Sequence, residues 1–368
     1  MDKFSEKYKL FYNVIDEYSD NPYISITRTL DTVTKIVIPS EIDGIPVKYI
    51  AKGAFKKHKN LIDVEIKEGI TSIGKSAFEG VLNLQKTTFP HSLKIIEDDA
   101  FIGCKKLINV VTQEGLEKIG EYAFVDCPFK KFDFPDSLTR IDKKAFAHTG
   151  LQYINLGKNL ETICSRAFSD LKNLETVTFN EGLKSIEDFA FLDCVKLKDI
   201  KIPDSVERIS ESIVEGCTSL ESFHFGANTA LSFSSLGFAF DCKSLKKITV
   251  SPNNKHYNVI NSILYDIYTN GLVVVPAALD MKHINVPKWV EELYPFCFAD
   301  NKNIETIKFN RHNVGGLYDS FNSGQNITII CPTDSEIYKI AKENNINVRT
   351  SESQIDVFLE KLNKEKTI

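Results

Sequence analysis

The chain has 368 residues, of which 42% are hydrophobic and 26% are charged, and its formal net charge at pH 7 is -5. These proportions are typical of a soluble folded protein, and the weak negative charge offers no basic surface for nucleic acid. No run of 18 apolar residues occurs, so the sequence predicts no transmembrane segment. As printed, residues 1–9 lack the apolar core of a signal peptide and residues 361–368 carry no anchor, which favours a cytoplasmic protein.

The first 29 residues are expected to cap one end of the fold. Apolar residues over 10–15 and 23–27, joined by a Ser-Asp-Asn-Pro turn, predict a hairpin. The spacing of Phe4, Tyr8, Phe11 and Ile15 is also compatible with a helix, and the sequence leaves this alternative open.

A short signature, Ala-Phe or once Cys-Phe, recurs nine times along the chain. The first seven copies are 22 or 23 residues apart, which is typical of a solenoid whose turns bury apolar residues by stacking on each other. We therefore expect a repeat solenoid of about 11 or 12 turns over residues 30–332. The copies begin at Ala54, Ala77, Ala100, Ala123, Ala145, Ala167, Ala190, Ala239 and Cys297.

Each turn reads as two extended segments followed by a corner. Ile200 and Ile202 alternate with Lys201, which is the pattern of a strand with one buried face, and Pro203 then ends that strand. A second short segment follows, and the Ala-Phe pair forms the corner, where the phenylalanines are expected to stack in a buried column.

The cysteines are expected to be structural. Five of the eight share one register position, and side chains at stacked positions approach in parallel, which suits a disulfide poorly. We expect a column of buried thiols that pack as small apolar groups. The five are Cys104, Cys127, Cys194, Cys217 and Cys242.

The spaced pattern L-x-x-I-x-I-P-x-x-V-x-x-I-x-x-x-A-F-x-x-C, seen from Leu107 to Cys127 and from Leu197 onward, resembles the BspA-like (treponemal-type) leucine-rich repeat family. The resemblance implies a β-rich, curved right-handed superhelix with a parallel sheet on its concave face. It also implies a non-enzymatic bacterial surface protein, secreted or cell-attached, that acts in adhesion. An intracellular interaction scaffold is the alternative.

Two rows of side chains are expected to point outward from the concave strands. They mix both charges with small polar groups, which favours a protein or carbohydrate partner over a phosphate-rich one, and an ordinary solvated sheet without a partner is the alternative. The candidate binding residues are Lys131, Asp133, Tyr153, Asn155, Thr176, Thr178, Asp199, Lys201, Ser222, His224, Lys247 and Thr249.

The repeat is irregular in two places. Ile213 and Val214 replace the Ala-Phe pair, so that corner should be repacked. Residues near 257–276 predict an inserted β-hairpin, either projecting as a contact surface or simply enlarging one repeat. The only tryptophan, Trp289, occupies a loop position where aligned turns have Ser137 or Ser205, and it is a contact candidate unless it packs on the hairpin.

Residues 333–368 are expected to form a helical cap. Residues 335–342 predict one helix, with Asp334 or Ser335 as N-cap, and Ile355, Phe358 and Leu362 follow the spacing of a second. The seven histidines are scattered, and no nucleotide-binding or hydrolase motif occurs. The sequence therefore predicts no metal, no cofactor and no enzymatic activity, and we expect a monomer.

Overall fold

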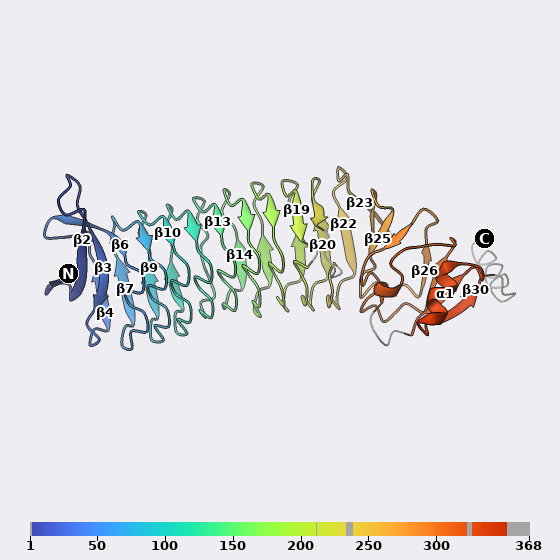
Figure 1. Cartoon of the computed structure of the whole chain (residues 1–368), viewed down its shortest axis with the longest axis horizontal. Helices are drawn as coiled ribbons and strands as arrows, with labels where there is room; N and C mark the ends of the chain where they lie inside the picture. The colour runs from blue at the N-terminus through green and yellow to red at the C-terminus, as the bar shows by residue number, and fades with distance from the viewer. Residues whose placement is uncertain (1, 211, 233–237, 322–325, 352–368) are drawn as a thin grey trace.

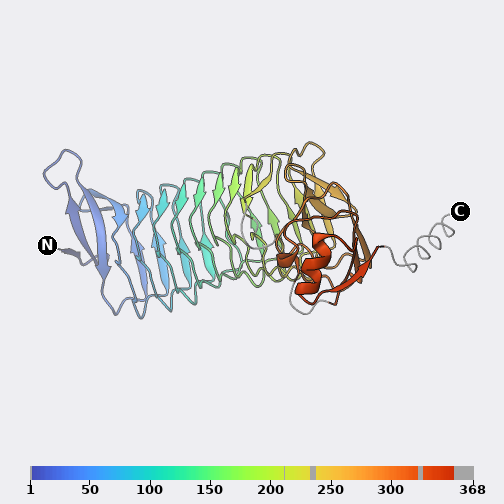
Figure 2. The same cartoon turned by 45° about the vertical axis from the view of Figure 1, so that its right-hand side comes forward.

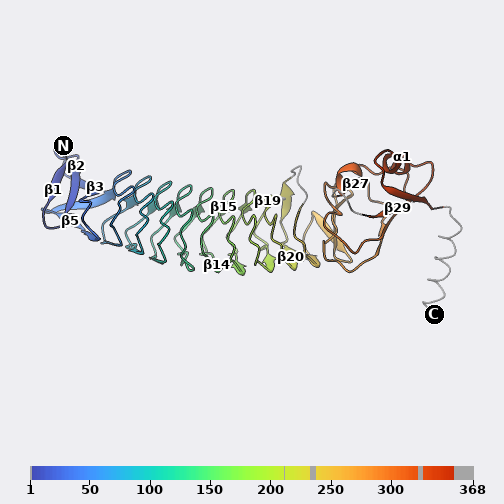
Figure 3. The ribbon, with the colours of Figure 1, turned by 90° about the horizontal axis from the view of Figure 1, so that it is seen from below.

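The structure is a computed structural model that describes residues 2–210, 212–232, 238–321 and 326–351. The chain winds into an elongated β-solenoid in which successive turns lie side by side along the long axis (Figure 1). Parallel strands form two rows on opposite sides of the stack, and Figure 3 shows these rows from below. The fold is therefore the repeat solenoid that the period predicts.

One side, the long-strand face, carries the first extended segment of each turn. The strands pair in parallel, in register, in four sheets of two to four strands. They are β4 (Lys35–Ile38), β7 (Asp63–Ile66), β9 (Lys86–Thr88) and β11 (Asn109–Val111), then β14 (Tyr153–Asn155) and β16 (Thr176–Thr178), then β18 (Asp199–Lys201), β20 (Ser222–Phe225) and β22 (Lys247–Val250), and finally β26 (His283–Val286), β28 (Thr306–Phe309), β29 (Thr328–Cys331) and β30 (Asn347–Thr350).

The opposite side, the short-strand face, carries the second segment. Most of its strands have only two residues, because the Ala-Phe corner follows almost at once. The strands are β6 (Ile45–Ile50), β8 (Ser72–Ile73), β10 (Ile95–Ile96), β12 (Lys118–Ile119), β13 (Arg140–Ile141), β15 (Thr162–Ile163), β17 (Ser185–Ile186), β19 (Arg208–Ser210) and β21 (Ala230–Ser232), with β5 (Glu41–Ile42) antiparallel to β6.

The phenylalanines of the corners form the expected column. Consecutive rings from Phe55 to Phe191 stack at centroid distances between 4.9 and 5.6 Å, and each of these side chains is at most 2% exposed. The column ends there because Ile213 and Val214, both fully buried, fill the next corner without a ring. The predicted repacking at this corner is confirmed.

The eighth signature, Ala239-Phe240, does not continue the column. The backbone N–H of Cys242 bonds to the carbonyl of Ala239 at 3.1 Å, as that of Cys104 bonds to Phe101, so Ala239 occupies the place of the column ring. Phe240 lies one position further on and packs edge-on against Phe296 at 5.2 Å. The sequence prediction was wrong here by one residue, because the two-letter signature does not determine which of its residues occupies the position of the ring column.

The five register cysteines are buried, as expected. Each thiol donates to a backbone carbonyl of the preceding turn, for example Cys104 Sγ to Phe78 O and Cys194 Sγ to Phe168 O, both at 3.2 Å. Burial raises the pKa of Cys127 and of Cys194. All eight cysteines are free, so they act as small core residues.

The N-terminal end is closed by antiparallel strands rather than by a helix. β1 (Lys3–Ser5) pairs with β2 (Leu10–Ile15), and β2 pairs with β3 (Tyr23–Thr29). β3 then pairs in parallel with β6, so the hairpin covers the first turn of the short-strand face (Figure 2).

The predicted hairpin is present but does not project. β23 (Tyr257–Ile260), β24 (Ile263–Asp266) and β25 (Gly271–Val274) form an antiparallel meander, and β25 pairs in parallel with β27 (Glu292–Leu293) of the next turn. Every residue of β24 and β25 is buried. The enlarged-repeat interpretation is therefore correct, because the alternating apolar residues of the hairpin pack between neighbouring turns.

At the C-terminal end, a short 3-10 helix (Tyr318–Ser320) precedes one α-helix, α1 (Glu336–Glu343). The side chain of Ser335 caps α1 by accepting the N–H of Tyr338 at 3.1 Å. The second helix that the sequence predicts, over 355–362, lies outside the described residues. Within the described ranges, no helix has the length and apolar character needed to cross a membrane.

Candidate binding surface

Ten of the twelve candidate binding residues lie on five neighbouring strands, β14, β16, β18, β20 and β22. We call these ten residues the contact rows: Tyr153, Asn155, Thr176, Thr178, Asp199, Lys201, Ser222, His224, Lys247 and Thr249. Parallel, in-register pairing joins β14 to β16 and joins β18 through β20 to β22, so equivalent positions align from strand to strand. Inward residues such as Ile154 and Ile200 are 1% exposed, which forces their neighbours outward.

Lys131 and Asp133 are not on a strand, contrary to the sequence prediction. Residues 130–134, between β12 and β13, form no ladder, and the side chains of Lys131 and Asp133 pair with each other at 2.9 Å on the surface. Pro135 has the register of Pro203, which follows β18, so Pro128, which removes a backbone donor just before the segment, is the proline that distinguishes this turn. The three buried phenylalanines of the segment, Phe129, Phe132 and Phe134, pack against the column instead, so the sheet of the long-strand face is interrupted here.

Side chains within the contact rows form hydrogen bonds with one another. Ser222 Oγ donates to Asp199 Oδ1 at 2.5 Å, and the His224 ring lies 2.8 Å from the hydroxyl of Thr249. Burial, and secondarily the charge of Lys201, lowers the pKa of His224, so its imidazole is neutral at pH 7. The rows therefore present a positioned set of donors and acceptors.

The contact rows carry three exposed charged side chains, Asp199, Lys201 and Lys247, of which Asp199 accepts the bond from Ser222. Lys201 and Lys247 are both exposed, and neither forms an ion pair within the described part of the chain. Neighbouring Lys246, in contrast, pairs with Glu221 at 3.3 Å. Lys201 and Lys247 are therefore available to a ligand without first breaking a salt bridge.

The structure adds two residues that the sequence prediction omitted. β26 presents His283 and Asn285 outward, and His283 Nδ1 lies 2.9 Å from Thr306 Oγ1 of β28. This repeats the His-Thr pair of His224 and Thr249 further along the same face. The alternation His-Ile-Asn-Val at 283–286 is the sequence signal that identifies this strand.

Trp289 is both packed and exposed. Its ring meets the ring of Tyr265 edge-on at 5.0 Å, yet 40% of the residue remains accessible. Tyr265 belongs to β24 and is 2% exposed, and burial raises its pKa to about 12. The packing on the hairpin that the sequence allowed is thus present, and part of the residue remains accessible to solvent.

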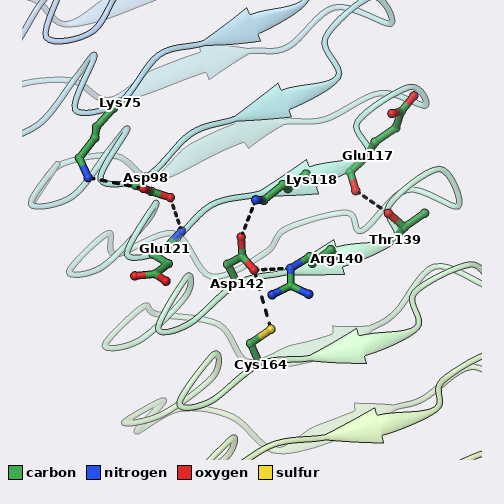
Figure 4. A network of polar contacts seen from close by, with 9 residues as sticks. All are labelled: Lys75, Asp98, Glu117, Lys118, Glu121, Thr139, Arg140, Asp142 and Cys164. Atoms are coloured by element: carbon green, nitrogen blue, oxygen red, sulfur yellow. Dashed lines mark hydrogen bonds and ion pairs between the residues drawn. The ribbon is translucent and has the colours of Figure 1, made fainter.

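The short-strand face carries a polar network that the sequence did not indicate (Figure 4). The carboxylate of Asp142 is 8% exposed and lies 3.0 Å from Lys118 Nζ and 2.5 Å from Arg140 Nε. Cys164 Sγ, from the following turn, approaches the same carboxylate at 3.8 Å. Because its members come from adjacent turns and satisfy one another, this network joins turns and is not a ligand site.

No cluster of three or more histidine, cysteine or acidic residues that could hold a metal ion occurs among the residues that the structure describes. The side chains of the contact rows offer recognition by hydrogen bonds and charge.

Known proteins share this architecture. The model of the BspA type leucine-rich repeat region, present in six copies, matches residues 29–152, 139–263 and 277–353. None of the curated proteins compared with the chain is a match.

Two solved structures have the same fold. A leucine-rich repeat protein from Bacteroides ovatus ATCC 8483 superposes with a TM-score of 0.61 and 22% identity, over 93% of this chain and 98% of that one. A leucine rich cell surface protein from Faecalibacterium prausnitzii A2-165 gives 0.53 and 19%, over 96% and 95%.

Proposed function

Because the chain belongs to the BspA-type leucine-rich repeat family, we propose that it is a non-enzymatic binding scaffold of a bacterial surface, which contacts a protein partner through the contact rows. The observation that carries the proposal is the alignment of ten outward side chains on five neighbouring strands. A rigid repeat holds these groups in place before the partner arrives, which lowers the entropic cost of binding.

The dimensions of the contact rows suit the centre of a protein interface. Five strands at about 4.8 Å spacing span roughly 20 Å, and strands of three or four residues are about 10 Å long, so the rows cover about a quarter of the roughly 800 Å² that each partner contributes to a standard interface. Tyr153 is 54% exposed at one end of the rows, and Lys201 and Lys247 lie toward the other. An aromatic anchor and unpaired cations are groups that a protein surface can match.

The surface location is supported by the family and by the Faecalibacterium relative, which is described as a cell surface protein. Fractionation of the native host tests it. Recovery of the protein in the envelope or medium is expected, and recovery in the cytosol alone would favour an intracellular scaffold instead.

The contact rows are tested by charge reversal. A partner is first captured with the intact protein, and its affinity is then measured for Lys201→Glu combined with Lys247→Glu. We expect at least a tenfold loss with an unchanged circular dichroism spectrum, because both lysines are exposed. Lys143→Glu, an exposed lysine beside the short-strand face, is the matched control and should bind normally. Equal affinity of the double variant and the control would move the interface away from the contact rows.

A further inference from the structure

One loop position distinguishes the turn that contains Trp289. In eight other turns the residue before the first buried position of the short segment is a glycine, a serine or an asparagine. These residues are Gly69, Ser92, Gly115, Ser137, Asn159, Gly182, Ser205 and Asn228. At the same place the chain has Trp289, its largest side chain and its only tryptophan.

The serines at this position make a hydrogen bond between turns that tryptophan cannot make. Ser92, Ser137 and Ser205 are half-buried rather than exposed, and each hydroxyl donates to a carbonyl of the preceding turn at 2.8 to 2.9 Å. Trp289 has no hydroxyl with which to make this inter-turn bond. Among the described residues, its ring contact is a T-shaped pair with Tyr265 at 5.0 Å, and 40% of the residue faces solvent. Stacking of the solenoid therefore does not account for a tryptophan at this position.

The loop around Trp289 is fixed from both neighbouring turns. The N–H of Glu291 donates to the carbonyl of Asn270 in the preceding turn at 2.8 Å. From the following turn, Arg311 donates to the carbonyl of Lys288 at 3.3 Å and to Glu291 Oε1 at 3.1 Å. These bonds anchor the residues on both sides of Trp289, so the indole is held in a defined position without a ligand.

The residues of the loop around Trp289 are polar. Arg311 Nη2 lies 3.1 Å from Glu291 Oε1, and Lys288, which precedes Trp289 in the chain, is exposed. Tyr268, which is 71% exposed, belongs to the loop of the preceding turn. An aromatic face is electron-rich and attracts polarised C–H groups, while carboxylate and guanidinium groups bond to hydroxyls. A sugar ring has a C–H face and a rim of hydroxyls, and it needs far less apolar area than a protein interface does.

We propose that Trp289 is the stacking platform of a carbohydrate-binding site, in which Glu291 and Arg311 bond to sugar hydroxyls. The site lies in the loops that join the long and short strands, apart from the contact rows, and it adds a second ligand class to the proposed function.

The test begins with a glycan array probed with the wild-type protein and with Trp289→Ser. Serine is the residue that three other turns have at this position, so this variant should fold and keep its thermal midpoint. We expect the wild type to bind a defined glycan class and Trp289→Ser to lose it by at least tenfold. Trp289→Phe, which keeps a ring, should retain much of the affinity.

The bound glycan is then titrated against the wild type while indole emission is followed. Because Trp289 is the only tryptophan, a saturable change in emission reports contact at this residue. Lys143→Glu is the control for nonspecific loss and should bind the glycan normally. Equal glycan binding by wild type and Trp289→Ser, an array without any bound glycan, or a protein partner whose affinity alone depends on Trp289 would each overturn the proposal.

Discussion

Replacement of Phe146 by alanine tests the packing of the aromatic column. Phe146 is fully buried, and its ring stacks on Phe124 at 5.4 Å and on Phe168 at 5.5 Å. Removal of a buried phenylalanine side chain costs about 3 to 5 kcal/mol, since transferred apolar area is lost and a cavity remains.

Three further rings place Phe146 at the upper end of this range. Phe129, Phe132 and Phe134 meet it edge-on at 6.4, 4.9 and 5.2 Å. Edge-on pairs contribute about 0.5 to 1.5 kcal/mol beyond their buried area. We therefore expect Phe146→Ala to lower the free energy of unfolding by about 4 to 5 kcal/mol.

The assay is urea unfolding followed by circular dichroism and by Trp289 emission, with coincident transitions as the criterion for two-state behaviour. Phe55→Ala is the matched control, because Phe55 stacks on one column ring, Phe78, at 4.9 Å. It should cost about 3 kcal/mol. A loss below about 1 kcal/mol for Phe146→Ala, or a larger loss for Phe55→Ala, would refute the contact-based reasoning.

Two further predictions concern the network on the short-strand face. Burial, and then the charge of Glu187, raises the pKa of Cys164 from 9.0 to about 11. The folded state therefore keeps the thiol neutral at a pH at which the unfolded chain already ionises it. The free energy of unfolding should consequently fall as the pH rises from 9 to 11. Cys164→Ala should flatten the alkaline fall in unfolding free energy by up to about 1.4 kcal/mol per pH unit, and a slope identical to wild type in urea titrations at fixed ionic strength would contradict this. Asp142→Asn should cost about 1 kcal/mol, because its partners Lys118 and Arg140 are 45% and 52% exposed and solvent screens the pairs. The difference should shrink in 1 M NaCl as a Debye length of about 3 Å screens the charges, and a difference independent of salt would argue against an electrostatic origin.

Much of the fold could be predicted because the repeat ties each residue to a place in a turn. The alternation of Ile200, Lys201 and Ile202 predicts β18, and the same offset places the other long strands. The ring column follows from the fixed distance between the Ala-Phe pairs. Where the pattern repeats, the local preference of the backbone and the packing between turns favour the same structure.

The errors occurred where neighbouring turns decide the outcome. The segment around Lys131 and Asp133 has the strand pattern, yet Pro128 and packing of the phenylalanines against the ring column keep it out of the sheet. Ala239 and Phe240 match the signature, yet the hydrogen bond of Cys242 shifts the register by one. The paired carboxylate of Asp142 could not be foreseen, because its cations come from the same and the preceding turn.

For the candidate site, the sequence predicted which side chains of the contact rows point outward, but it did not predict the hydrogen bonds between them. Outward positions follow from the period of two along each strand. The bond between His224 and Thr249 depends on which strands are neighbours and on the rotamers of both side chains, and a single strand does not encode either.

The end of the ring column marks where this solenoid can change its sequence without losing its stacking. Beyond Phe191 the corner at Val214 has no ring. One hydrogen bond in the next corner links two residues that are far apart in the chain. The N–H of Asp241 bonds to the carboxylate of Asp300 at 2.9 Å, across 59 residues. The chain between them forms the enlarged repeat and the turn with Trp289, and it returns to the stack at Asp300. The buried strands β24 and β25 of this stretch pack between turns, so substitutions there would disturb the stack, whereas exposed loop positions such as Trp289 are free to vary and to carry a recognition site.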